Sequence, residues 1–263
     1  MIVDGRKISK RILDEAKDKI GKSGKKLRLA AVLVGDNPEL KKFVELKRKA
    51  AEDTGIEFRI YEFPEDISSN QLREELNKIA KVKTTHGVII ELPLPGHLNT
   101  QYLLNTIPEE KDVDVLSEKS QGKFFTGRSK VLPPSVEAVK QIFGEYNINP
   151  KGKTAAVFGY GLLVGKLVSH WLIQQGATVS VVTEHTKDPI RYSLFADLII
   201  SGVGRPNLIT ANMVKDSAIV IDFGRDVDFD AVSKKAGYIT PPLGGVGPIV
   251  VAAVLKNLVE LNL

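Results

Sequence analysis

The chain has 263 residues, enough for one large domain or two ordinary ones, and its shares of hydrophobic (43%) and charged (26%) residues are ordinary for a globular protein. It contains no cysteine, which excludes disulfides, a thiolate nucleophile and a cysteine metal site, and which fits a reducing, cytoplasmic setting. The net charge of +5 comes largely from lysine, and because no aromatic residues interleave with the basic ones, it indicates a solvated surface or a site for an acidic small molecule rather than nucleic-acid binding.

The N-terminal segment, residues 1–13, alternates charged and apolar residues and lacks the features of a signal peptide, and no stretch of the chain reaches membrane-spanning length. After it, short β-branched runs alternate with longer segments whose apolar residues recur at intervals of three and four, as in 38–53 and 68–81. The β-branched runs predict strands at residues 29–35, 58–63, 87–92, 154–159, 178–184, 197–204 and 218–224. Strands that alternate with helices are typical of parallel sheets built from right-handed crossovers, so we expect an α/β protein.

A polar, turn-rich stretch interrupts this alternation between residues 107 and 135, and it predicts a domain junction. The last segment, 247–263, is apolar at helical spacing and begins with Gly-Pro, which predicts a closing helix. The chain is therefore expected to form two α/β domains.

In the second half, a predicted strand runs into Gly159, Gly161 and Gly165 and then into a helical segment. Glycines at such a turn let the backbone approach a pyrophosphate, and the N-terminus of the following helix offers free N–H groups and a favourable dipole. The spacing favours a dinucleotide site, although a tight turn without a ligand has the same pattern. Glu184 ends the next predicted strand, 25 positions after Gly159, where an acid grips the ribose hydroxyls and repels a 2′-phosphate, so it favours NAD over NADP.

In the first half, the predicted strand at 87–92 ends unusually, because its apolar residues run directly into the carboxylate of Glu91 and then into two prolines. A buried strand that stops at a charge often faces a site. Lys47 lies four residues after Phe43 and shares a helix face with it, while Asp114 lies in the polar junction. Taken singly, these residues also fit plain roles as surface side chains and turn formers.

Seven motifs occur together, namely VGDNPELKKFVELKRKAAEDTGI, GVIIELPLPGHL, IPEEKDVDVLS, GYGLLVGK, SGVGRPN, VIDFG and ITPPLGGVGP. In order and spacing they resemble the bifunctional methylenetetrahydrofolate dehydrogenase/cyclohydrolase family over nearly the whole chain. The resemblance implies a folate-binding catalytic domain, with three α/β layers and a parallel sheet, formed by residues 1–130 and 245–263. It also implies a Rossmann-like nicotinamide-binding domain formed by 131–244, a final helix that returns to the first domain, a folate cleft between the domains, and a homodimer through the nucleotide domains.

The reactions implied by the resemblance are oxidation of 5,10-methylenetetrahydrofolate with NAD or NADP and hydrolysis of the methenyl product to 10-formyltetrahydrofolate. The family's active lysine falls on Lys47, and the aspartate that binds the pterin falls on Asp114, whose carboxylate accepts paired hydrogen bonds from the ring. Phe43 stands where the family has a tyrosine that stacks on the pterin, so the ring remains and the hydroxyl is lost. The other substrate-binding residues implied are Pro93, Gly244 and Gly245.

On the folate side, the chain departs from the family at Glu91, which replaces a glutamine, at Val115, which replaces a glycine, and at Leu243, which replaces a proline. A carboxylate near an amine favours the ammonium form. We therefore predict that Lys47 and Glu91 titrate as a coupled pair, in which Lys47 works as a cation or acid, or Glu91 is itself protonated or takes over the proton chemistry.

On the nucleotide side, Tyr160 removes an arginine that the family uses against the 2′-phosphate of NADP, and the segment that carries Arg225 is shortened. NAD is therefore the favoured cofactor. The cofactor-binding residues expected are Gly159, Tyr160, Gly161, Gly165, Glu184, Gly204 and Arg225.

The leading expectation is a folate enzyme with both activities, in which the dehydrogenase half is the more altered. Three alternatives remain: a catalytically impaired folate-binding or regulatory homologue, an enzyme with the cyclohydrolase activity alone, and a related two-domain dehydrogenase that acts on another substrate. No metal site is expected, because the four histidines are scattered without metal-ligand spacing.

Overall fold

The computed structural model describes all 263 residues, which divide into two compact units. Unit 1 consists of Met1–Ser9 and Ser135–Val250, and unit 2 consists of Lys10–Pro134 and Val251–Leu263. Two helices cross this division, because α1 (Gly5–Ser23) and α10 (Val246–Asn262) both begin in unit 1 and continue in unit 2. None of the helices is both long and apolar enough to cross a membrane.

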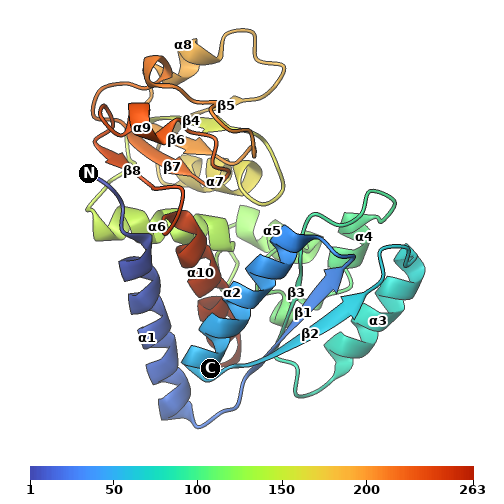
Figure 1. Cartoon of the computed structure of the whole chain (residues 1–263). Coiled ribbons are helices and arrows are strands. Elements are labelled where there is room, and N and C mark those ends of the chain that lie inside the picture. Colours follow the sequence, from blue (N-terminus) through green and yellow to red (C-terminus); the bar gives the residue numbers. More distant parts are fainter. The chain divides into compact units, whose positions relative to one another are not determined.

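Unit 2 contains a parallel three-stranded sheet in the order β2-β1-β3 (Figure 1). Its strands are β1 (Arg28–Val34), β2 (Glu57–Phe63) and β3 (Gly87–Ile90). Strands β1 and β3 are buried almost throughout, as expected of parallel strands with both faces covered. The other helices of this unit are α2 (Pro38–Thr54), α3 (Ser69–Lys81), α4 (Thr100–Leu104), α5 (Glu118–Phe125) and the short 3₁₀ helix η1 (Glu109–Lys111).

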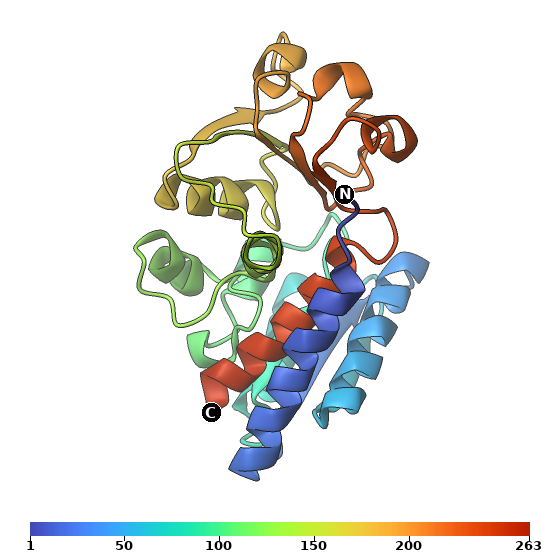
Figure 2. The ribbon, with the colours of Figure 1, turned by 90° about the vertical axis from the view of Figure 1, so that its left-hand side faces the viewer.

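The core of unit 2 joins α1, α10 and β1. Ala16 of α1, Leu258 of α10 and Leu29 of β1 belong to one buried cluster, and the two helices run side by side in both views (Figures 1 and 2). Helix α2 is capped at its N-terminus by Asn37, whose side chain accepts the N–H groups of residues 39 and 40, and at its C-terminus by Gly55 in the left-handed conformation. Both ends of α2 are therefore fixed, and so is the backbone that carries Lys47 in its middle.

Unit 1 contains a parallel five-stranded sheet in the order β5-β4-β6-β7-β8. Its strands are β4 (Thr154–Phe158), β5 (Thr178–Val182), β6 (Leu198–Ser201), β7 (Ile219–Asp222) and β8 (Tyr238–Ile239). Its helices are α6 (Pro134–Glu145), α7 (Gly165–Gln174), α8 (Pro189–Ser193), α9 (Phe229–Val232) and the 3₁₀ helix η2 (Ala211–Met213). The N-terminal residues extend the sheet, because Ile2 pairs with Ile239 and the N–H of Val3 donates to the Ile239 carbonyl at 2.8 Å.

The expected α/β fold with parallel sheets is confirmed, and each of the seven predicted strands is present. The predictions for 87–92 and 197–204 were too long, because β3 ends at Ile90 and β6 ends at Ser201. In both places the chain turns away at the residues that were expected to be functional. Strand β8 was missed, because two residues are too few to produce a recognisable pattern.

Candidate functional site

Lys47 and Glu91 form a close ion pair within unit 2. Lys47 projects from α2, and Glu91 follows β3 directly, held there by the hydrogen bond from its N–H to the Val32 carbonyl at 2.9 Å. The Lys47 Nζ atom lies 2.7 Å from Oε1 and 2.8 Å from Oε2 of Glu91, so it contacts both carboxylate oxygens. The side chains are only 14% and 4% exposed, which makes this a desolvated pair in which loss of one partner leaves the other charge uncompensated.

Asp114 belongs to the same group of charges. Burial raises the pKa of Asp114 to about 7, the Lys47 ammonium opposes this shift, and the carboxylates of Glu91 and Asp112 add to it. We call these four residues the acid–lysine cluster. Near neutral pH the cluster therefore contains a carboxyl group that gains or loses its proton easily.

The segment that carries Asp114 is held from two sides. The buried Asp112 carboxylate accepts the N–H groups of Leu116 at 3.2 Å and Ser117 at 2.9 Å. From α10, the Nδ2 atom of the fully buried Asn257 donates to the carbonyls of Val113 and Leu132, both at 2.8 Å. These contacts fix the peptide that joins residues 113 and 114, so the carboxyl group of Asp114 stands on a rigid segment.

Val115 adopts a conformation that its side chain disfavours. Its φ is +58°, in the left-handed region, where the expected family pattern has a glycine. A β-branched residue there costs on the order of 1–2 kcal/mol. Val115 is 1% exposed, so burial of its side chain offsets this cost.

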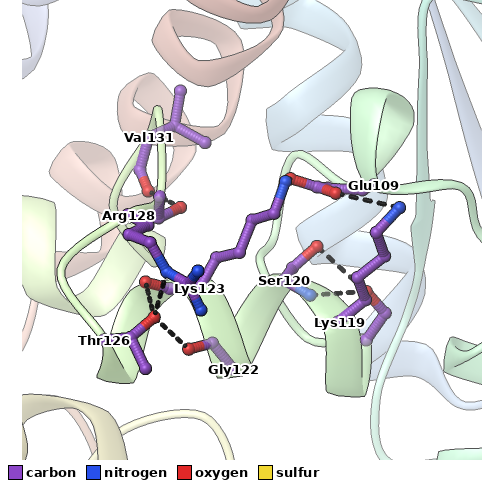
Figure 3. A network of polar contacts seen from close by, with 10 residues as sticks. Glu109, Lys119, Ser120, Gly122, Lys123, Thr126, Arg128 and Val131 are labelled. Atoms are coloured by element: carbon purple, nitrogen blue, oxygen red, sulfur yellow. Dashed lines mark hydrogen bonds and ion pairs between the residues drawn. The ribbon is translucent and has the colours of Figure 1, made fainter.

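Ion pairs join the two short helices, η1 and α5, that lie on either side of Asp114 in the chain. Glu109 of η1 pairs with Lys119 at 3.2 Å and with Lys123 at 2.5 Å, both on α5, and these lysines hold the pKa of Glu109 below its ordinary value (Figure 3). Because Asp114 lies between η1 and α5 in the chain, these contacts limit the movement of both ends of its loop. The last turn of α5 is closed by Thr126, whose hydroxyl donates to the Gly122 carbonyl at 2.8 Å.

Of the other expected substrate residues, Phe43 and Pro93 are exposed, Gly244 is half-buried and Gly245 is buried. Phe43 is one turn before Lys47 on α2 and is 46% exposed, so its ring is available for stacking. Pro93 follows the cis Leu92–Pro93 peptide and lines a cavity of about 350 Å³ at the carboxyl ends of β1 and β3. Gly244 and Gly245 lie in a turn of unit 1 just before α10.

In unit 1, two of the three predicted glycines are required by the backbone, Gly165 by close packing and Gly159 by its positive φ. A Cβ on Gly165 would lie 2.1 Å from the Gly159 carbonyl oxygen, and Gly159 itself has a φ of +88°. Gly161 faces open space. This turn ends at the start of α7, where no side chain caps the helix, so the arrangement fits a pyrophosphate bound at a helix N-terminus.

The residues expected to determine the preference for NAD or NADP are exposed on loops of unit 1. Tyr160 is 56% exposed, and the Lys166 Nζ atom lies 5.5 Å from its ring centroid. Glu184 lies two residues after β5, and its carboxylate is 3.6 Å from His185. Gly204 and Arg225 follow β6 and β7 and both have positive φ. All of these residues are therefore on segments that follow the carboxyl ends of strands, where open α/β sheets bind ligands.

Two side chains with supporting roles, Asp112 and Asn257, were not predicted from the sequence. Asn257 is a polar residue within an apolar helix, a pattern that was visible but not distinctive.

Comparison with known proteins shows similarity over the whole chain. The model of the tetrahydrofolate dehydrogenase/cyclohydrolase catalytic domain matches residues 3–114, and the model of the NAD(P)-binding domain of the same family matches residues 133–262. The bifunctional protein FolD of Nautilia profundicola is 41% identical, with 98% of this chain and 96% of the relative covered.

Two solved structures are similar throughout. The bifunctional FolD enzyme of Campylobacter jejuni is 37% identical with a TM-score of 0.94, covering 99% of this chain and 98% of the other. The Trypanosoma brucei methylenetetrahydrofolate dehydrogenase-cyclohydrolase, solved with NADP and an inhibitor, is 29% identical with a TM-score of 0.95, covering 99% and 96%.

Proposed function

The chain belongs to the tetrahydrofolate dehydrogenase/cyclohydrolase family, and from this premise we propose that it oxidises 5,10-methylenetetrahydrofolate and hydrolyses the 5,10-methenyl product to 10-formyltetrahydrofolate. The observation that carries the proposal is the acid–lysine cluster, in which a mostly buried amine contacts the Glu91 carboxylate and interacts electrostatically with Asp114, in the unit that contains the folate catalytic motifs. We assign folate chemistry to unit 2 and nicotinamide binding to unit 1.

In this proposal Asp114 binds the pterin, since an ionised carboxylate accepts two hydrogen bonds from the ring's amino group and adjacent N–H. Phe43, one helical turn from Lys47, supplies the stacking surface. Lys47 then lies near the one-carbon bridge, where its charge favours negative charge that develops on a reacting oxygen.

Hydrolysis of the methenyl bridge needs a group that both takes and returns protons. Addition of water to the bridging carbon releases one proton, and the bond from that carbon to N5 then breaks as N5 gains a proton and the hydroxyl loses one. The Lys47–Glu91 pair supplies such a group, because a proton can be shared between the amine and either of two carboxylate oxygens at 2.7 and 2.8 Å.

Unit 1 would hold the nicotinamide dinucleotide through the turn from Gly159 to Gly165 and the start of α7. When bound, the cofactor accepts the hydride in the oxidation. We propose that NAD is preferred over NADP, supported by Glu184 after β5 and by Tyr160 in place of an arginine.

The test is an assay of both half-reactions with NAD and with NADP, on the wild type and on Lys47→Ala. Loss of the cyclohydrolase reaction in Lys47→Ala is expected, while Lys49→Ala, which removes an exposed lysine from the same helix, should keep it. Folate binding without turnover in the wild type would favour the catalytically impaired homologue. A strong preference for NADP would contradict the role given to Glu184.

We also propose a homodimer formed through unit 1. Strand β5 is an edge strand, and exposed apolar side chains occur on it (Val181), on α7 (Ile173) and just after α8 (Phe195). Light scattering after size exclusion should show a dimer, and Phe195→Asp should weaken it. Leu243→Asp, an equally exposed apolar position outside this surface, serves as the control.

A further inference from the structure

Asp226 is a fully buried carboxylate in unit 1 with three hydrogen-bond donors around it. Oδ2 accepts the Ser201 hydroxyl at 2.5 Å and the Val203 N–H at 2.8 Å, and Oδ1 accepts the Arg205 N–H at 2.6 Å. All three donors belong to residues 201–205, which comprise the last residue of β6 and the loop that follows it. Asp226 itself follows β7, so this one side chain ties together the loops at the ends of two adjacent strands.

The loop that carries Asp226 is compact. The Asp222 carboxylate accepts the N–H groups of Gly224 at 2.9 Å, Asp226 at 3.1 Å and Val227 at 3.0 Å, which closes the turn directly after β7. Arg225, between two of these anchored residues, has a φ of +59° and an exposed side chain. The shortened segment is therefore held by two carboxylates rather than left as an open loop.

The two loops touch through their backbones. A Cβ on Gly224 would lie 2.5 and 2.7 Å from the oxygens of Asp226 and 2.7 Å from the Gly204 nitrogen. Gly224 thus permits the close approach that brings Asp226 onto the other loop.

The same segment also packs against the glycine turn after β4. A Cβ on Gly202 would lie 2.9 Å from Cβ of Val164, and one on Gly159 would lie 3.1 Å from a methyl group of Val203. The position of residues 202–204 therefore sets one wall of the space beside the turn that we assign to the pyrophosphate.

We propose that Asp226 is a positioning residue for the dinucleotide: it holds residues 203–205 against the glycine turn, so that Gly204 and Arg225 meet the cofactor in a fixed arrangement. The inference rests on the proposed nicotinamide site of unit 1. A fixed loop does not have to be ordered when the ligand binds, and this lowers the cost of binding.

Asp226→Asn tests the inference, because it keeps the size of the side chain and places an NH₂ group where N–H donors require an acceptor. Calorimetric titration with NAD and with NADP should show an affinity for the preferred cofactor that is lower by on the order of 10-fold or more. The cyclohydrolase reaction, assayed with methenyltetrahydrofolate and no nicotinamide, should stay within about 2-fold of the wild type, since the hydrogen bonds of Asp226 are all to residues of unit 1 and the acid–lysine cluster belongs to unit 2.

Asp228→Asn is the matched control. Asp228 lies two residues further on and accepts the Ala231 N–H at 3.2 Å at the start of α9, without contact to residues 201–205. It should lose a little stability and keep its cofactor affinity.

Two further variants keep the inference testable if Asp226→Asn folds poorly. Ser201→Ala removes one donor and should weaken cofactor binding by a smaller factor, and Gly224→Ala should reproduce the larger defect by pushing the loops apart. Unchanged cofactor affinity in folded Asp226→Asn or in Gly224→Ala would overturn the inference, and so would an equal loss of cyclohydrolase activity. A wild type that binds neither nicotinamide would instead refute the proposed function.

Discussion

Asp114→Asn should change how the stability of the protein depends on pH. Burial raises the pKa of Asp114 from 3.8 to about 7, so the folded chain keeps a proton that the unfolded chain loses. Because the folded pKa is raised, the contribution of this group is fully present below about pH 4 and is lost as the pH rises to about 7. Asparagine has no proton to lose, so the variant should gain stability relative to the wild type as the pH rises.

The size of the expected change in stability follows from the pKa shift of Asp114. About three pKa units correspond to at most about 4 kcal/mol, and Asp114 keeps some exposed surface, which makes this an upper limit. The interval from pH 5 to pH 7 spans about two of these units, or about 2.7 kcal/mol. At about 2 °C per kcal/mol for a chain of this size, the difference in Tm between variant and wild type should grow by about 5 °C between pH 5 and pH 8.

Thermal melting of both proteins at pH 5 and pH 8, without folate, measures this difference. An equal Tm difference at both pH values would refute the reasoning. Asp197→Asn provides a control without pH dependence in this interval, because the hydrogen bond from Lys215 lowers the pKa of Asp197 to about 2. That carboxylate contributes stability that is lost only as the pH falls from about 4 toward 2, so the difference in Tm between Asp197→Asn and the wild type should be the same at pH 5 and pH 8.

Three other substitutions test the acid–lysine cluster and its support. Glu91→Gln should change the pH profile of cyclohydrolase turnover, because it removes the charged partner that lies 2.7 and 2.8 Å from the Lys47 Nζ atom; an unchanged profile would remove the pair from the mechanism. Val115→Gly should destabilise the chain by about 1–2 kcal/mol in urea unfolding, because lost burial and added unfolded-state entropy outweigh the relief of strain, and a gain in stability would show that strain dominates. Asn257→Asp should lower the affinity for folate, measured at a temperature at which the variant is fully folded, because the donors to the carbonyls of Val113 and Leu132 are lost. Unchanged folate affinity would argue against the idea that Asn257 holds the segment of Asp114 in place.

The strands were predictable because each is a run of buried β-branched or apolar residues, a signal that lies within a few consecutive positions. Their ends were less predictable. The predicted strand at 87–92 included Glu91 and Leu92, but the ladder between β1 and β3 pairs only as far as Ile90. Whether a strand continues depends on the neighbouring strand, and that information lies elsewhere in the chain.

The same limit explains which site residues were found. Lys47, Glu91 and Asp114 were identified through motifs that resemble a family, whereas their spatial relation required the fold. Asn257 contacts Val113 across 144 positions, and Asp226 contacts Ser201 across 25. No local sequence pattern indicates either contact. Residues that hold other residues in position therefore cannot be predicted from motif spacing alone.

The charge balance of the acid–lysine cluster suggests why Glu91 is tolerated in place of a neutral amide. Glu91 and Lys47 compensate each other, and the Asp112 carboxylate is satisfied by two backbone N–H groups, which leaves Asp114 as the group whose charge is adjustable near pH 7. A methenyltetrahydrofolate cation bound beside Asp114 would favour its ionised form, and the ionised form is also the one that accepts paired hydrogen bonds from a pterin. On the proposed function, the Glu91 carboxylate disfavours ionisation of Asp114 before the substrate arrives, so that ionisation of Asp114 is coupled to substrate binding.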